Sequence, residues 1–270
     1  MQEAKIVFGI MDATIKTYVE NQSGEYVLVI KDNEMNVFVK EIDDKAQTYD
    51  KVRMLAGAIA QDLQKKQIEK ALVDDREFKQ AFPKLDDKKV ITAFVEGWNL
   101  GSYQFQSYKS EKKNHKVTLS LKQEAIRKKE VNEGIIRAKA TAFSRDLMNE
   151  IPSKLTPETF PEILKQTFAN SSVEVIVHDK TALEKMEMNG LLAVNRGSKH
   201  DPAFIELHYK GNVNKPLVAL VGKGVTFDTG GISLKNARDL SDMRMDMGGA
   251  AAVAGAVKLL ADLNADVNVV

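Results

Sequence analysis

The chain has 270 residues, of which 43% are hydrophobic and 29% are charged, a balance that indicates a globular protein and excludes disordered and collagen-like chains. Its 39 basic and 38 acidic residues leave a net charge of +1, so overall electrostatics favour neither a nucleic acid nor an anionic membrane as partner. The absence of cysteine excludes disulfides, cysteine-bound metals and a cysteine nucleophile. No apolar run approaches the ~20 residues of a membrane span, and we expect a cytoplasmic protein.

The first 122 residues are expected to form a small α/β domain. Runs rich in β-branched and aromatic residues predict strands, and apolar residues at helical spacing predict one helix. The expected strands are Glu25–Ile30, Asn36–Val39 and Val90–Val95, with a turn at Asp32–Glu34 between the first two and a helix at Lys51–Lys65.

A basic run precedes a long helical pattern. The run contains Lys109, Lys112, Lys113, His115 and Lys116. It is open to two interpretations, a nucleic-acid contact and a solvated connector. We favour the connector because no aromatic platform or groove-reading motif accompanies the run. The helical pattern over Gln123–Asn149 predicts that residues 123–150 connect two domains.

Residues 151–270 alternate strand-like and helical patterns, which predicts a parallel sheet covered on both faces. Strands are expected at Val173–Val177, Ala203–Leu207 and Leu217–Val221, and helices at Thr181–Met188 and Gly248–Leu263. Val267–Val270 has the composition of a strand that is just beginning. We therefore expect this second domain to be incomplete, with an apolar sheet edge that invites association.

The segment with the clearest chemistry is glycine-rich and follows the strand predicted at Leu217–Val221. Ligands gather at the carboxyl edge of such strands, but the segment fits neither phosphate-binding glycine pattern. Asp228 and Asp246 offer oxygen ligands for zinc, manganese or magnesium, and Lys223 offers an amine nitrogen if it is neutral. Spacing alone leaves a second interpretation open, a glycine-rich turn that carries surface charges.

Other reactive residue types do not form a recognisable site. The four histidines, at 115, 178, 200 and 208, have no metal-ligand spacing, and Ser233 lacks a nucleophile elbow. We expect Trp98 to pack inside the first domain, and Met243, Met245 and Met247 to fill the core.

Residues 221–249 resemble the signature of the leucyl aminopeptidases, also called cytosol aminopeptidases. The matching blocks are G-K-G-V-T-F-D-T-G-G-I-S-L-K, at residues 222–235, and D-M-R-M-D-M-G-G-A-A, at residues 242–251. Weaker similarity extends over roughly residues 90–270 and includes R-D-L-M-N at the domain junction. The resemblance implies an α/β fold with a small macro-like N-terminal domain, a long connecting helix and the first part of a di-metal catalytic domain.

The resemblance also implies roles for five residues. Lys223, Asp228 and Asp246 match metal ligands, with Asp228 bridging two divalent ions, which would be Zn²⁺ or Mn²⁺ with Mg²⁺ as a third alternative. Lys235 matches the catalytic lysine that polarises the scissile carbonyl, and Met243 matches a residue of the pocket for the first side chain. The implied substrates are peptides with a free, preferentially apolar N-terminal residue such as leucine. The implied assembly is a cytoplasmic homohexamer.

One departure from the family pattern is large. The family completes its metal site with the segment N-T-D-A-E-G-R, which does not occur in the 270 residues. We therefore expect a truncated family member that is inactive by itself. A non-catalytic DNA-binding or assembly role remains the alternative, although the net charge argues against strong DNA binding. A third interpretation, a small-ligand role for the macro-like first domain, has no nameable residue to support it.

Overall fold

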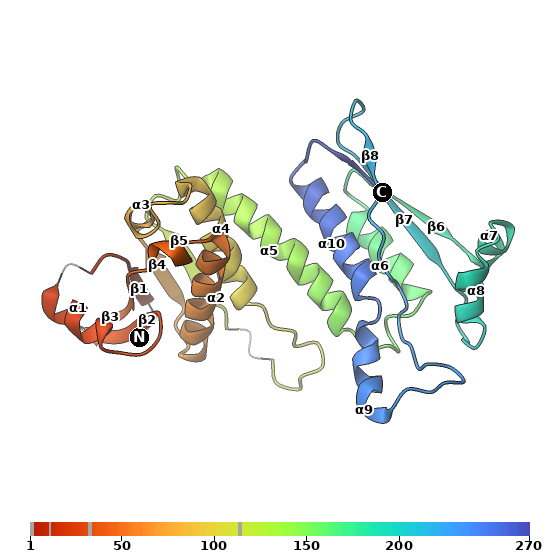
Figure 1. Cartoon of the computed structure of the whole chain (residues 1–270), viewed down its shortest axis with the longest axis horizontal. Helices are drawn as coiled ribbons and strands as arrows, with labels where there is room; N and C mark the ends of the chain where they lie inside the picture. The colour runs from red at the N-terminus through yellow and green to blue at the C-terminus, as the bar shows by residue number, and fades with distance from the viewer. Residues whose placement is uncertain (1–2, 11, 32–33, 113–114) are drawn as a thin grey trace. The chain divides into compact units, whose positions relative to one another are not determined.

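The computed structural model describes residues 3–10, 12–31, 34–112 and 115–270 (Figure 1). The chain divides into two compact units, residues 1–139 and 140–270. The division falls inside helix α5 (Lys128–Asn149), which begins in the first unit and ends in the second. The helix predicted to begin at Gln123 begins instead at Lys128. Residues 123–126 form turns directly after strand β5, and the Ile126 N–H donates to the Gln123 carbonyl.

The first unit contains a five-stranded mixed sheet in the order β2-β3-β1-β4-β5. β2 and β3 pair antiparallel, and the other neighbours pair parallel. The strands are β1 (Glu3–Val7), β2 (Tyr26–Lys31), β3 (Glu34–Val39), β4 (Lys70–Val73) and β5 (Thr118–Leu121). The two predicted N-terminal strands are confirmed. Of the turn predicted between them, residues 32–33 lie outside the described residues, and Glu34 already belongs to β3.

Helices connect these strands. They are α1 (Ala13–Glu20), α2 (Tyr49–Lys65), α3 (Phe78–Ala81) and α4 (Asp87–Gly101), with 3₁₀ turns η1 (Asp44–Ala46) and η2 (Asp75–Glu77). The predicted helix at Lys51–Lys65 is confirmed as α2, but the predicted strand at Val90–Val95 is wrong, because these residues lie within α4. All six are buried, so this part of the helix has no polar face to reveal its period, and a short apolar run does not distinguish a buried strand from a buried helix.

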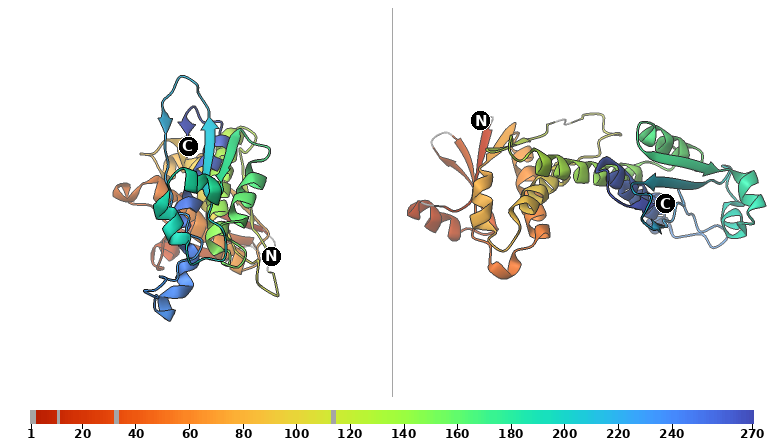
Figure 2. Two further views of the ribbon diagram at one scale, coloured as in Figure 1. Left: turned by 90° about the vertical axis from the view of Figure 1, so that its right-hand side faces the viewer. Right: turned by 90° about the horizontal axis from the view of Figure 1, so that it is seen from above.

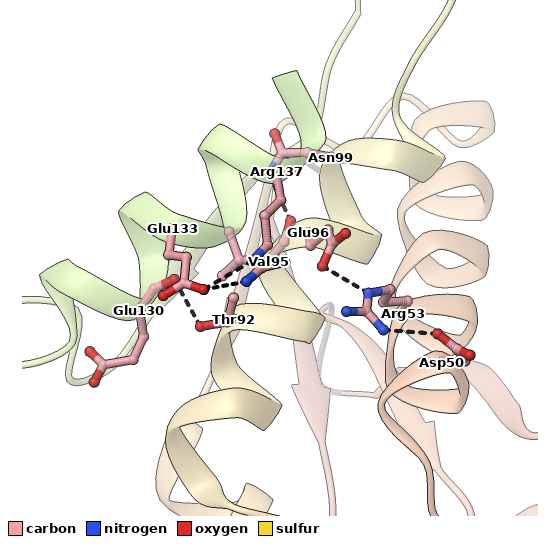
Figure 3. A network of polar contacts seen from close by, with 9 residues as sticks. All are labelled: Asp50, Arg53, Thr92, Val95, Glu96, Asn99, Glu130, Glu133 and Arg137. Atoms are coloured by element: carbon pink, nitrogen blue, oxygen red, sulfur yellow. Dashed lines mark hydrogen bonds and ion pairs between the residues drawn. The ribbon is translucent and has the colours of Figure 1, made fainter. Parts of the chain in front are cut away.

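Close packing explains why a helix forms there. A Cβ built on Gly97 of α4 would lie 2.2 Å from the carbonyl oxygen of Arg53 on α2, so the two backbones touch at this point. Polar contacts surround this crossing (Figure 3). The Arg53 Nε donates to Glu96 at 2.8 Å, and the Thr92 hydroxyl donates to the Glu130 carbonyl of α5 at 3.3 Å. These contacts join α4 to both α2 and α5.

The second unit contains a four-stranded sheet in the order β6-β7-β9-β8, which Figure 2 shows from two further directions. The strands are β6 (Val173–His178), β7 (Phe204–Lys210), β8 (Leu217–Val218) and β9 (Asn268–Val269). The prediction of a parallel sheet is wrong for two of the three pairs of neighbouring strands. The pairs β6–β7 and β7–β9 are antiparallel, and the pair β8–β9 is parallel. The strand predicted at Leu217–Val221 keeps its start but extends over only two residues.

The course of the connection from β6 to β7 explains why these two strands pair antiparallel. It contains α7 (Lys180–Lys185) and α8 (Asn189–Asn195), of six and seven residues. The chain leaves the sheet after His178 and re-enters it at Phe204, which pairs with His178. The connection therefore returns to the same end of the sheet, and β7 runs antiparallel to β6.

The remaining helices of this unit are α6 (Thr159–Phe168), α9 (Ala237–Leu240) and α10 (Gly248–Asp262), with the 3₁₀ segment η3 (Ser241–Met245). α6 and α10 contribute to the core against one face of the sheet. The predicted helix from Gly248 is confirmed. Within the described part of the chain, no helix is both long enough and apolar enough to cross a bilayer.

Candidate active site

The glycine-rich segment predicted to carry the chemistry begins just beyond β8 and lies against the first turn of α10. A Cβ on Gly222 would lie 2.4 Å from the Gly249 carbonyl oxygen, and the Lys223 carbonyl accepts a hydrogen bond from the Ala250 N–H at 2.8 Å. This contact explains why glycine stands at position 222 in the loop and at position 249 at the start of α10. The spacing of the loop residues does not predict this contact, although the Gly248-Gly249 pair at the start of α10 is a usable signal for it.

Lys223 and Asp246 form the first of two lysine–carboxylate pairs. The Lys223 Nζ lies 2.8 Å from the Asp246 Oδ2. The aspartate side chain is 17% exposed, and its Oδ2 is buried without a hydrogen bond of good geometry. This buried oxygen is balanced by the Lys223 ammonium alone, and a cation that replaced the ammonium could bind there.

Lys235 and Asp228 form the second pair, with Nζ 2.9 Å from Oδ2. The Asp228 Oδ1 also accepts the Gly230 N–H at 2.8 Å. The Lys235 ammonium, followed by this backbone N–H, holds the pKa of Asp228 below its usual range, and the charge of Lys223 acts in the same direction. The two pairs are therefore parts of one electrostatic cluster.

A tight turn brings Lys235 back to Asp228. Gly230 and Gly231 have φ angles of +87° and +66°, a region that favours glycine, and the Lys235 N–H donates to the Thr229 carbonyl at 2.9 Å. The Lys235 ammonium also contacts the Met243 sulfur at 3.0 Å. The structure thus joins Lys235 both to Asp228 of its own loop and to Met243 of the separate segment η3.

The donor set fits part of a divalent-metal site. Two carboxylates and one amine that can ligate when deprotonated are the ligand types that zinc, manganese or magnesium would use. Among the described residues, no group of three or more histidine, cysteine, aspartate or glutamate side chains is arranged to hold a metal ion. The cluster therefore supplies some of the ligands of a metal site but not a full ligand shell.

Two histidines that the sequence analysis treated as unrelated share one carboxylate. His178 Nε2 lies 2.8 Å from one Glu206 oxygen, and His208 Nε2 lies 2.7 Å from the other. His200 instead contacts Glu158 at 3.1 Å.

The predicted packing role of Trp98 is confirmed, because it is 2% exposed. In the basic run, Lys113 lies outside the described residues.

Comparisons with known proteins identify the family to which the chain is similar. The model of the cytosol aminopeptidase family catalytic domain matches residues 142–270, and that of the family's N-terminal domain matches residues 43–112. The chain is 38% identical over 194 residues to a probable cytosol aminopeptidase of Clostridium perfringens, covering 68% of this chain and 39% of that protein. It is 38% identical over 185 residues to the human cytosol aminopeptidase, covering 66% of this chain and 35% of that protein.

Solved structures show the same fold. The bottromycin maturation enzyme BotP superposes with a TM-score of 0.83 at 27% identity, covering 100% of this chain and 58% of BotP. The cytosol aminopeptidase of Coxiella burnetii superposes with a TM-score of 0.73 at 20% identity, covering 99% of this chain and 57% of that one. The chain belongs to the cytosol aminopeptidase family, a family of peptidases, and it spans less than half the length of the Clostridium and human relatives.

Proposed function

We propose that this chain carries part of the active site of a metal-dependent aminopeptidase, which removes N-terminal residues, preferentially apolar ones such as leucine, from peptides. The observation that carries the proposal is the cluster of two lysine–carboxylate pairs, Lys223–Asp246 and Lys235–Asp228. Family membership supports it, and a structure of BotP is described as a complex with Mn.

Each side chain of the cluster has a proposed role. Lys223, Asp228 and Asp246 would hold two divalent ions, with Asp228 between them. When bound, the ions supply Lewis acidity toward the scissile carbonyl and lower the pKa of water. Lys223 must lose its proton to become a ligand. Lys235 keeps its proton and donates to the carbonyl oxygen as negative charge develops there, while Met243 lines the pocket for the first side chain.

Location and assembly follow as further proposals. We propose that the full-length protein is a cytoplasmic homohexamer that uses Zn²⁺, Mn²⁺ or Mg²⁺. The names of the curated relatives, which are cytosol aminopeptidases, support the location. The alternative, a non-catalytic DNA-binding or assembly role, predicts salt-dependent binding to duplex DNA. With a net charge of +1, we expect no binding even at low salt.

A metal titration tests the ligand assignment. We expect the purified chain to bind Mn²⁺ weakly, as followed by electron paramagnetic resonance. Asp228→Asn and Asp246→Asn should each weaken binding at least about tenfold, because each removes an anionic ligand. Asp242→Asn is the matched control, since Asp242 lies in the same segment but is 66% exposed and 3.7 Å from Arg244. Equal Mn²⁺ affinity in all four proteins would refute the assignment.

An activity assay tests whether the 270 residues suffice. We propose that the chain by itself does not turn over substrate, because the described residues supply too few carboxylates for two ions. Hydrolysis of leucyl p-nitroanilide is measured with Mn²⁺ or Zn²⁺, and again with a chelator. Rates equal to the buffer blank are expected in every case. Chelator-sensitive turnover would show that the cluster is sufficient.

A further inference from the structure

The last part of helix α5, which belongs to the second unit, packs directly against helix α10. A Cβ built on Gly255 of α10 would lie 2.0 Å from the Ser144 hydroxyl oxygen and 3.1 Å from the Ala140 carbonyl oxygen, both of α5. Two turns nearer the start of α10, a Cβ on Gly248 would lie 3.3 Å from the Met148 methyl carbon. The two helices therefore run antiparallel along a close contact that reaches the first turn of α10.

A hydrogen bond joins the two helices at this contact. The Ser144 hydroxyl donates to the Ala251 carbonyl of α10 at 2.8 Å, and it lies farther, at 3.4 Å, from the Ala140 carbonyl of its own helix. Ala251 is fully buried, and a hydrogen bond in such a low-dielectric environment is stronger than one in water. The bond therefore fixes how far α10 is shifted along α5, which apolar packing alone specifies less sharply.

The first turn of α10 is also the point to which two proposed metal ligands are attached. The Lys223 carbonyl accepts the Ala250 N–H at 2.8 Å, which holds the loop against this turn. Asp246 lies two residues before α10, and its N–H donates to the Met243 carbonyl at 3.2 Å. The 2.8 Å separation of the Lys223 and Asp246 side chains therefore depends on where the turn lies.

The stability of α5 does not explain a serine at position 144. Serine is less favourable than alanine inside a helix, so the residue lowers the intrinsic preference of α5 for helix. Its hydroxyl has a single proton, which the bond to the Ala251 carbonyl uses. What the hydroxyl provides and an alanine would not is a directed link from α5 to α10.

We propose that Ser144 is a positioning residue for the metal site. Its hydroxyl holds the first turn of α10 in place and thereby sets the separation of Lys223 and Asp246. This inference rests on the proposed function, in which both side chains are metal ligands. Groups that bond directly to a ligand change metal affinity by about 10- to 100-fold when they are removed. Since Ser144 acts through a helix, we expect a smaller effect, about three- to tenfold.

The experiment compares Mn²⁺ affinity, followed by electron paramagnetic resonance, with stability, followed by urea denaturation. Ser144→Ala should weaken Mn²⁺ binding about three- to tenfold and change the urea midpoint little, because the better helix propensity of alanine offsets part of the lost bond. Thr167→Ala is the matched control, since the Thr167 hydroxyl donates within its own helix, α6, to the Ile163 carbonyl at 2.8 Å. Equal Mn²⁺ affinity in the two variants would overturn the proposal.

Gly255→Ala tests the same contact from the side of α10. Its Cβ would meet the Ser144 hydroxyl oxygen at 2.0 Å, so α10 must shift and Mn²⁺ binding should weaken more than in Ser144→Ala. Without the hydroxyl, the nearest atoms would be the Ala140 carbonyl oxygen at 3.1 Å and the Cβ of residue 144 at 3.4 Å. The double variant should therefore bind Mn²⁺ about as tightly as Ser144→Ala alone, whereas additive losses would contradict the proposal.

Two further measurements separate this inference from the ligand assignment. If Asp246→Asn weakens Mn²⁺ binding but Ser144→Ala does not, the positioning role is wrong and the assignment stands. If neither weakens it, the assignment is wrong and the positioning role is wrong with it. Hydrogen exchange needs no metal: the Ala250 amide, which bonds to Lys223, should exchange at least about threefold faster in Ser144→Ala than in Thr167→Ala. Equal exchange rates would also overturn the proposal.

Discussion

Gly222→Ala tests whether the close contact between the loop and α10 holds the candidate site together. The added Cβ would lie 2.4 Å from the Gly249 carbonyl oxygen, whereas ordinary contacts begin at 3.4 Å, so loop and helix must separate by about 1 Å. Overpacking of this kind costs about 1–3 kcal/mol. Loss of the bond from Ala250 to the Lys223 carbonyl adds about 1 kcal/mol, which gives an expected loss of about 2–4 kcal/mol.

Gly224→Ala is the matched control, because a Cβ there would lie 3.5 Å from the Ala250 Cβ, an ordinary contact. Neither glycine has φ in the left-handed region, so alanine strains neither backbone. The assay is hydrogen exchange of the β6–β7 amides, which should accelerate by about 30- to 700-fold for Gly222→Ala and by less than about threefold for the control. Equal rates in the two variants would show that the backbone contact does not stabilise this unit.

Two further predictions concern backbone packing at Gly97 and the acid dependence of stability, both in the first unit, with Gly190 of the second unit as an open-space comparison. Gly97→Ala should cost at least about 3 kcal/mol, since its Cβ would meet the Arg53 carbonyl at 2.2 Å, whereas Gly190→Ala, with open space around it, should be neutral or slightly stabilising; urea denaturation checks both. The Arg76 side chain holds the pKa of Asp74 well below its usual range, so this carboxylate stabilises the fold above about pH 4 and the contribution is lost as pH falls. Asp74→Asn should flatten that acid dependence of the urea midpoint, and an unchanged slope would contradict it.

The candidate site was predictable because its signals are local. Glycines at 230 and 231 mark the turn that brings Lys235 back to Asp228, and the preceding apolar run marks the strand end. Asp246 is different, because it lies 23 positions from Lys223. Its contact depends on how η3 and α10 fold against the loop, which no spacing rule specifies. Its residue type and the family resemblance both pointed to Asp246, and the structure supplied the 2.8 Å contact.

The errors in the fold have non-local causes. Val90–Val95 lies in a helix that packs against α2, where Gly97 lets the backbone approach Arg53, 44 positions earlier in the chain. The antiparallel pairing of β6 with β7 depends on two short helices that reverse the chain within one connection. Composition and periodicity report whether a residue is buried, but they do not report which element buries it or from which direction.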